Sequence, residues 1–290
     1  MNQTTKSTWV NTDLYPFQAR FFQTPHGALH YIDEGEGPIL LFVHGTPTWS
    51  FLYRNYIKAL SKHYRCIALD HLGFGLSEKP PHFEGTPPLH AENLTALINH
   101  LQLKDINLVV HDFGGSIGLS YAIQQPQNVS KIVLFNTWLW ETASDKGAQK
   151  IDGILNSTFG RLLYLYSNFS PKILLKQGFH NKKKLSKIIH HHYQKPFTQK
   201  QERYGLLNMG KALVGCSDWY QQQWEQMHRL QHCPFLILWG MQDAFITPPY
   251  LERWIQKLPH AQVQQFEAGH FVQEEAFDSS LQYLQTFLMQ

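Results

Sequence analysis

The stretch Val109-Val110-His111-Asp112-Phe113-Gly114-Gly115-Ser116 decides how this chain folds. An apolar run typical of a buried strand, 106–110, leads into it, and glycines that permit a tight turn follow it. We therefore expect a strand that turns sharply into a helix at Asp112. The residue at the apex of such a turn projects from the edge of the sheet, beside the free N–H groups of the helix.

Other short runs rich in Val, Ile, Leu and Phe recur on both sides of this stretch, with helical patterns between them. This alternation is typical of a parallel sheet that is covered by helices on both faces. The sequence therefore predicts an α/β fold with a mostly parallel sheet. The predicted strands are 29–32, 39–43, 66–69, 106–110, 132–135, 235–239 and 263–266.

One long segment, 137–231, interrupts this alternation. It is rich in aromatic residues and has helical spacing of apolar residues in 162–175, 185–193 and 206–214. We interpret it as a helical cap inserted in the core, so that 1–136 and 232–290 form the core. The cap is expected to lie over the carboxyl ends of the strands, where open α/β sheets bind ligands.

The composition limits the class of protein. With 290 residues, of which 43% are hydrophobic, the chain can bury a large core, and its three cysteines are expected to be reduced. No apolar run is long enough to span a bilayer and the first residues are polar, so we expect a cytoplasmic protein without a membrane partner. The sequence does not specify an oligomeric state.

The charged and histidine-rich clusters are interpreted as surface features. The net charge is +3, and Lys182-Lys183-Lys184 is expected to be a solvated helix face, not a nucleic-acid site. Neighbouring residues of a helix point in different directions, so His190-His191-His192 cannot all reach one metal ion. Nothing else indicates a metal or a cofactor, and Arg54 is expected to be a surface or supporting residue.

Residues able to carry out catalysis follow three of the predicted strands. Asp112 occupies the apex of the turn, where its ionised carboxylate can attack carbon without a base and form an ester. Hydrolysis of that ester needs a base for water, and His270 is the candidate. Asp243 is expected to orient His270. The backbone N–H groups of Thr46 and Phe113 are candidates for stabilising the oxyanion or the leaving group.

Five motifs together resemble the haloalkane dehalogenases, a branch of the α/β-hydrolase fold with an aspartate nucleophile. They begin at His44, Asp70, Val110, Trp239 and Ala268, and read HGTPTWS, DHLGFGLS, VHDFGG, WGMQD and AGHFVQE. The resemblance implies the chain order nucleophile, acid, histidine. It also implies an alternative acid, which one subgroup carries after the preceding strand and for which Glu141 would be the counterpart.

Two positions depart from the pattern of that family. Its members carry a halide-binding Trp after the nucleophile and a second donor, an Asn at the position of Thr46 or a Trp in the cap. Here Phe113 has no side-chain donor and Thr46 has only a hydroxyl. Indoles in and near the cap, Trp138, Trp140, Trp219 and Trp224, and several tyrosines are candidate replacements.

Three functions therefore remain open, all acting on a small apolar organic substrate. The first is hydrolysis of a haloalkane, with water, to an alcohol and a halide. The second is hydrolysis of an epoxide or a lactone by the same Asp112 nucleophile, because the turn also resembles that of epoxide hydrolases. The third is binding of a small molecule without catalysis.

Overall fold

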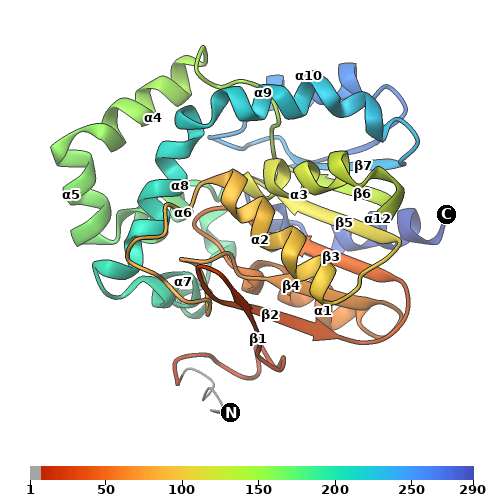
Figure 1. Cartoon of the computed structure of the whole chain (residues 1–290), viewed down its shortest axis with the longest axis horizontal. Coiled ribbons are helices and arrows are strands. Elements are labelled where there is room, and N and C mark those ends of the chain that lie inside the picture. The colour runs from red at the N-terminus through yellow and green to blue at the C-terminus, as the bar shows by residue number, and fades with distance from the viewer. Residues whose placement is uncertain (1–7) are drawn as a thin grey trace.

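A single eight-stranded sheet forms the centre of the computed structural model, which describes residues 8–290 (Figure 1). The strand order is β1-β2-β4-β3-β5-β6-β7-β8. β1 and β2 pair antiparallel, β2 pairs antiparallel with β4, and all other neighbours are parallel. The strands are β1 (Arg20–Thr24), β2 (Gly27–Glu34), β3 (Ile39–Val43), β4 (Arg65–Leu69), β5 (Ile106–His111), β6 (Val129–Phe135), β7 (Phe235–Gly240) and β8 (Gln262–Phe266).

The prediction of a mostly parallel sheet is confirmed, and each of the seven predicted strands lies within one of the strands β2 to β8. The prediction omitted β1, which reads RFFQT and has four exposed or partly exposed residues and a single buried residue at its end. β1 is an edge strand that pairs only with β2 in the sheet. An edge strand buries little apolar surface, so its sequence has no continuous apolar run to identify it.

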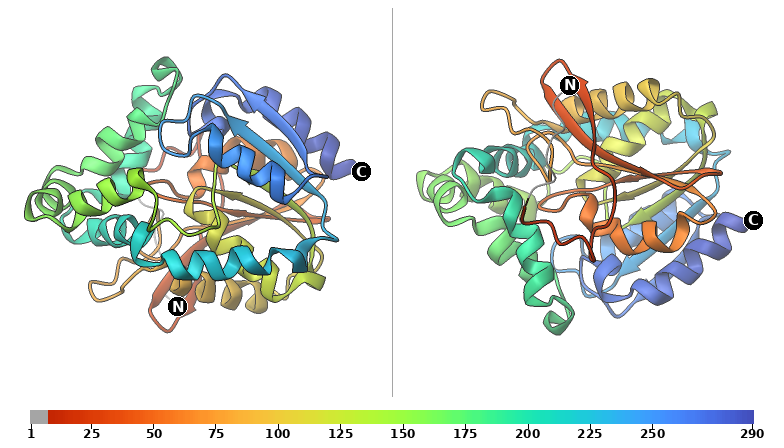
Figure 2. Two further views of the ribbon diagram at one scale, coloured as in Figure 1. Left: turned by 90° about the horizontal axis from the view of Figure 1, so that it is seen from above. Right: turned by 90° about the horizontal axis from the view of Figure 1, so that it is seen from below.

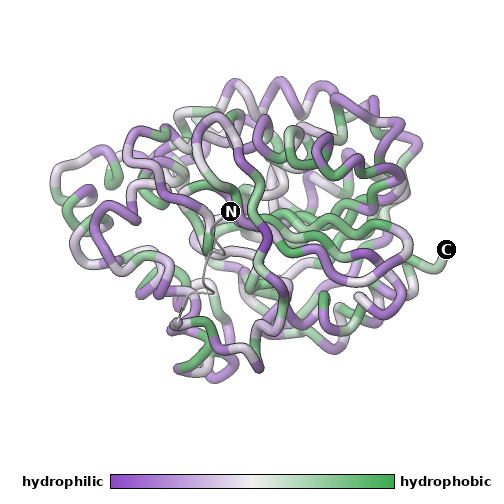
Figure 3. The backbone as a smooth tube through the Cα atoms, turned by 60° about the horizontal axis from the view of Figure 1, so that its bottom comes forward, coloured by the Kyte–Doolittle hydropathy of each residue, from purple (hydrophilic) through white to green (hydrophobic). Residues whose placement is uncertain are grey.

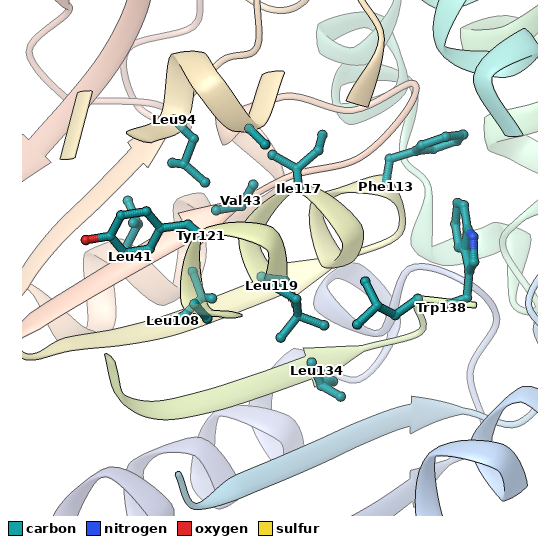
Figure 4. Packing of buried hydrophobic residues seen from close by; sticks show 14 of the residues in the cluster. Leu41, Val43, Leu94, Leu108, Phe113, Ile117, Leu119, Tyr121, Leu134 and Trp138 are labelled. Carbon is teal, nitrogen blue, oxygen red and sulfur yellow. The ribbon is translucent and has the colours of Figure 1, made fainter. Parts of the chain in front are cut away.

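Alternate residues of the central strands face opposite layers of helices. Leu41 and Val43 of β3, together with Leu108 of β5, belong to the apolar core beneath α2 (Pro87–His100) and α3 (Phe113–Gln124) (Figure 4). Phe42 and Val109 point the other way, into a second apolar core. The helices α1 (Arg54–Leu60), α11 (Val272–Glu275) and α12 (Phe277–Met289) cover this second core. Helix α10 (Pro248–Lys257) packs against the first core, together with α2 and α3. This period of two is what a sheet buried on both faces requires.

Between β6 and β7 the chain is helical throughout its regular structure. Figures 1 and 2 show α4, α5, α7 and α8 gathered at one end of the sheet, away from the C-terminus. We call residues 137–231 the cap. Its helices are α4 (Lys146–Asn156), α5 (Thr158–Ser167), α6 (Leu175–Gln177), α7 (Lys187–Gln194), α8 (Tyr204–Gly215) and α9 (Ser217–Glu225), with a π-helical turn at Ser170–Leu174.

The hydropathy of the backbone follows this arrangement. Figure 3 shows the central strands as the most hydrophobic part of the chain and the outer helices as mixed. Within residues 8–290, no helix combines the length and the apolar character needed to cross a bilayer. The three cysteines are free thiols, two of them buried.

Candidate active site

Asp112 lies at the apex of a strained turn between β5 and α3. Its φ of 54° and ψ of −131° are outside the regions that non-glycine residues normally adopt. Three backbone contacts hold this conformation: the Asp112 N–H donates to the Asn136 carbonyl (3.0 Å), the Thr137 hydroxyl donates to the Asp112 carbonyl (2.6 Å), and the Gly115 N–H donates to the same carbonyl (2.9 Å). A Cβ atom at Gly115 would collide with the Thr137 side chain, so the turn requires glycine there.

The loop after β3 contacts the Asp112 carboxylate directly. The Thr46 N–H donates to Asp112 Oδ1 at 2.8 Å. A Cβ atom at Gly45 would overlap that same oxygen, which explains why a residue without a side chain stands beside the carboxylate. The backbone N–H of Thr46 thus contacts the carboxylate directly, while its buried hydroxyl has no partner among residues 8–290.

His270 lies between the carboxylates of Asp112 and Asp243. Its Nδ1 is 2.7 Å from Asp243 Oδ2, and its Nε2 is 3.6 Å from Asp112 Oδ2. The first distance is a hydrogen bond, whereas the second is an ion-pair contact that exceeds hydrogen-bond length. Nδ1 therefore carries the proton toward Asp243, and Nε2 faces the carboxylate at the turn.

The Asp243 carboxylate is buried and fully engaged. Its Oδ1 accepts from the backbone N–H groups of Phe245 (2.8 Å) and Ile246 (3.1 Å), and its Oδ2 accepts from His270 and from Asn136 Nδ2 (2.9 Å). Four donors to one carboxylate compensate for its removal from water. Asn136, the first residue after β6, was not identified from the sequence, because one amide after a strand carries no distinctive signal.

The alternative acid, Glu141, is engaged elsewhere. Its carboxylate accepts from the N–H (3.1 Å) and hydroxyl of Ser144, at the start of the cap. These hydrogen bonds hold the pKa of Glu141 below its ordinary value. The residue beside the acid–histidine pair at the end of β6 is Asn136, five positions before Glu141.

Two carboxylates determine the charge of His270. Burial alone would lower the pKa of the imidazole, but Asp243 and Asp112 together outweigh burial and raise it to about 10. With Asp112 ionised, His270 is therefore a cation at neutral pH. An imidazolium cannot accept a proton, so His270 can serve as a base only after the negative charge on Asp112 has been removed.

The loop that carries His270 is fixed to both the core and the cap. Glu275 accepts from the N–H groups of Gly269 (2.8 Å), His180 (3.1 Å) and Asn181 (2.6 Å), which joins the residue before His270 to the cap. The His270 N–H donates to the carbonyl of another cap residue, Gly178, at 2.7 Å. These contacts fix the backbone of the His270 loop on two sides.

A buried ion pair lies directly after this loop. Arg54 binds Glu274 through both guanidinium nitrogens, with Nη2 at 2.8 Å, and Tyr193 of the cap donates to the same carboxylate. Both charged side chains are at most 3% exposed. Of the two roles expected for Arg54, surface or supporting, this buried contact fits the supporting one. The sequence could not reveal the pairing because 220 residues separate the partners.

Neutral histidines support the other loops of the site. His44 Nε2 accepts from the His71 N–H (3.0 Å), and His71 Nε2 donates to the His44 carbonyl (2.9 Å). His111 Nε2 donates to the His270 carbonyl at 2.9 Å. Burial lowers the pKa of each of these three side chains, so all are uncharged at neutral pH. Their hydrogen bonds join the loop after β3 to the loop after β4, and the end of β5 to the backbone of His270.

Phe113 and Trp138 lie next to each other at the N-terminal end of α3 (Figure 4). Their ring centroids are 4.8 Å apart and the rings meet edge to face. Trp138 is 3% exposed, and its Nε1 is a buried donor without a partner in the part of the chain that the structure describes. An unused donor at such a position costs free energy unless a ligand accepts from it. The sequence named this indole only as one of several candidates.

Comparison with known proteins identifies the family to which this chain belongs. The family described as the alpha/beta hydrolase fold matches residues 38–277. The chain is 33% identical to a cis-3-alkyl-4-alkyloxetan-2-one decarboxylase of Shewanella oneidensis, over 95% of this chain and 89% of that protein. It is 34% identical to haloalkane dehalogenase 2 of Mycobacterium tuberculosis, over 91% of this chain and 93% of that protein.

Solved structures with the same fold include other dehalogenases. The haloalkane dehalogenase DatA of Agrobacterium tumefaciens superposes with a TM-score of 0.86 over 97% of this chain and 99% of its own, at 22% identity. A putative ancestral haloalkane dehalogenase superposes with a TM-score of 0.78 over 88% of this chain and 93% of its own, at 25% identity. The resemblance deduced from the five motifs is thus confirmed, and the chain belongs to the α/β-hydrolase family as a haloalkane dehalogenase-like enzyme.

Proposed function

We propose that this enzyme hydrolyses the carbon–halogen bond of a small haloalkane through a covalent ester on Asp112. The observation that carries the proposal is the contact of one histidine, His270, with both Asp112 and Asp243 at 3.6 and 2.7 Å. A carboxylate at the turn attacks carbon directly, whereas a serine there would need a base. The related haloalkane dehalogenase 2 supports the choice of leaving group.

In the first step, one oxygen of Asp112 forms a bond to the halogen-bearing carbon and the halide departs with the bonding electrons. The departing anion needs a hydrogen-bond donor in a site shielded from water. Phe113 offers only its backbone N–H, so we assign the side-chain donor to Trp138, whose buried Nε1 has no partner among the described residues. Its edge-to-face contact with Phe113 puts this indole next to the residue that follows the nucleophile.

In the second step, water attacks the carbonyl carbon of the Asp112 ester. Esterification removes the negative charge of Asp112, one of the two charges that raise the pKa of His270. The imidazole can then lose its proton and accept one from the attacking water, while Asp243 keeps it oriented. The Thr46 N–H, which already contacts Oδ1, stabilises the developing oxyanion. The products are an alcohol, a halide and a proton.

Opening of an oxetan-2-one ring is the second candidate. It is favoured by the absence of a side-chain donor at Phe113 and by the 33% identity to an alkyloxetanone decarboxylase. The same Asp112 carboxylate would attack the strained ring, and the leaving oxygen would remain attached to the substrate. No free halide would then need a binding site.

Parallel assays of the purified enzyme separate these candidates. We would measure halide release from a series of bromo- and chloroalkanes, and alkene and CO2 release from a cis-3-alkyl-4-alkyloxetan-2-one. An epoxide series tests the remaining ring-opening reaction. Asp112→Asn serves as the control in each assay. Halide release that depends on Asp112 supports the proposal, whereas turnover of the oxetanone or epoxide alone would exclude it.

A further inference from the structure

The surface of the cap formed by α4 and α5 is unusually apolar for an exposed surface. We define the apolar stripe as Ile151 and Ile154 of α4 with Phe159, Leu162 and Tyr166 of α5. Phe159 is 72% exposed, Leu162 50% and Tyr166 61%. Their spacing of three and four residues puts them on one side of α5. Such a set of exposed apolar side chains marks a binding surface.

The two helices make the stripe continuous. α4 ends one residue before Ser157, α5 begins one residue after it, and the backbone and side chain of Ile154 lie against the first turn of α5 at Gly160. Figure 1 shows α4 and α5 at the end of the molecule farthest from the C-terminus. The stripe therefore lies on a protruding part of the cap.

The charge of the cap indicates what this surface binds. Residues 137–231 contain 14 Lys and Arg against 6 Asp and Glu, a net charge of +8, so the rest of the chain carries −5 of the overall +3. Basic side chains border the stripe: Lys150 and Arg161 are exposed on the same helices, and Lys200 Nζ contacts the Tyr166 hydroxyl at 2.6 Å. Apolar side chains bordered by lysine and arginine are typical of segments that lie on anionic bilayers.

We propose that the apolar stripe docks the enzyme on the surface of an anionic phospholipid bilayer. The absence of a membrane partner was expected because no segment can span a bilayer, but surface binding requires no such segment. Phe159 and Leu162 would insert among the acyl chains, and the basic cap would face the lipid phosphates while the acidic core faces water. This inference goes beyond the proposed function, since binding to the bilayer does not depend on which bond is cleaved.

Co-sedimentation of the whole enzyme with vesicles tests the proposal. We expect binding to phosphatidylglycerol/phosphatidylcholine vesicles, weaker binding to pure phosphatidylcholine, and loss of the difference at 1 M NaCl, where the screening length is about 3 Å. The double substitution Phe159→Gln/Leu162→Gln should weaken binding by about tenfold or more. It should leave turnover of a short, water-soluble substrate unchanged.

The matched control replaces two exposed apolar side chains that do not belong to the cap. Ile255→Gln/Tyr283→Gln changes residues with exposures of 38% and 42%, outside the basic cap, and should bind vesicles like the wild type. Sedimentation velocity without lipid tests a second copy of the chain as the occupant. Equal binding to both kinds of vesicle, equal loss in the two double variants, or a dimer that only Phe159→Gln/Leu162→Gln dissociates, would overturn the proposal.

Discussion

Nε2 of His270 lies 3.6 Å from Oδ2 of Asp112, too far for a hydrogen bond and close enough for an ion pair. The separation couples the charge of the imidazole to the state of the carboxylate. While Asp112 is ionised, the histidine stays protonated and cannot deprotonate water. Once Asp112 is an ester, that restraint is lost. Formation of the ester in the first step of the proposed reaction therefore allows His270 to act as the base in the second step.

The coupling predicts a change in the titration of His270. Asp112→Asn keeps the shape of the side chain but removes its charge, so the pKa of His270 should fall from about 10 toward its ordinary value. The imidazole signal in an NMR titration measures this fall. Asp33→Asn, which removes a carboxylate that pairs with Arg65 away from the site, is the control and should leave the pKa unchanged. An unaltered His270 titration in Asp112→Asn would show that the two residues are not coupled.

Asp243, and not Glu141, should support His270. Asp243→Asn removes the charge that favours the imidazolium and the acceptor for Nδ1–H, and is expected to lower kcat on the order of 10²- to 10⁴-fold. Glu141→Gln should retain most activity, because Glu141 contacts Ser144. Single-turnover rates of both variants provide the measurement. The assignment is wrong if the two variants show the opposite order.

Trp138 should bind the leaving group without stabilising the free enzyme. Trp138→Phe keeps a ring against Phe113 but deletes the N–H, so halide release should fall roughly 10- to 100-fold. The free energy of unfolding should remain equal or rise, because the substitution removes a buried donor that has no partner among the residues the structure describes.

Trp239→Phe is the matched control for this prediction. Trp239, in β7, is also buried, and its Nε1 has no partner within residues 8–290, yet it has no assigned role in the reaction. The control should keep its rate of halide release. Equal rates in wild type and Trp138→Phe would remove the indole from the proposed mechanism.

The buried histidines should make the fold sensitive to acid. Burial lowers the folded-state pKa of His44, His71 and His111, and that of His90 to about 3, below the unfolded value near 6.5. Their contribution is complete above pH 6.5 and is lost as the pH falls, by about 1.4 kcal/mol per pH unit for each proton taken up on unfolding.

Urea unfolding at pH 8, 6 and 5 measures this loss. His270 acts in the opposite sense, because its pKa is raised to about 10, and its contribution is lost as the pH rises above 6.5. Four histidines against one favour a net loss of stability in acid. His90→Phe should reduce the dependence, whereas the exposed His191→Phe should not. A free energy of unfolding that is constant between pH 8 and 5 would contradict the prediction.

The residues that sequence predicts and those that it misses differ in what surrounds them. Ile39–Val43 and the glycines after Asp112 carry local signals, since a buried strand is apolar and a tight turn needs small residues. Asn136 and Arg54 are identified by hydrogen bonds to partners far along the chain. Trp138 is identified by an indole N–H that is buried without a partner among residues 8–290. No local pattern encodes such contacts. β1 was missed because an exposed edge needs no apolar run.

The central claim is that substrate carbon becomes bonded to Asp112, and intact-protein mass spectrometry of His270→Phe tests it most directly. Without the base, the ester should form but not hydrolyse. Incubation with a bromoalkane that the wild type hydrolyses should therefore increase the mass of the protein by that of one alkyl group minus one proton. Peptide mapping should locate that mass on the fragment that contains Asp112, and His270→Phe/Asp112→Asn should show none. An unmodified His270→Phe protein, or an adduct on any other residue, would contradict the account.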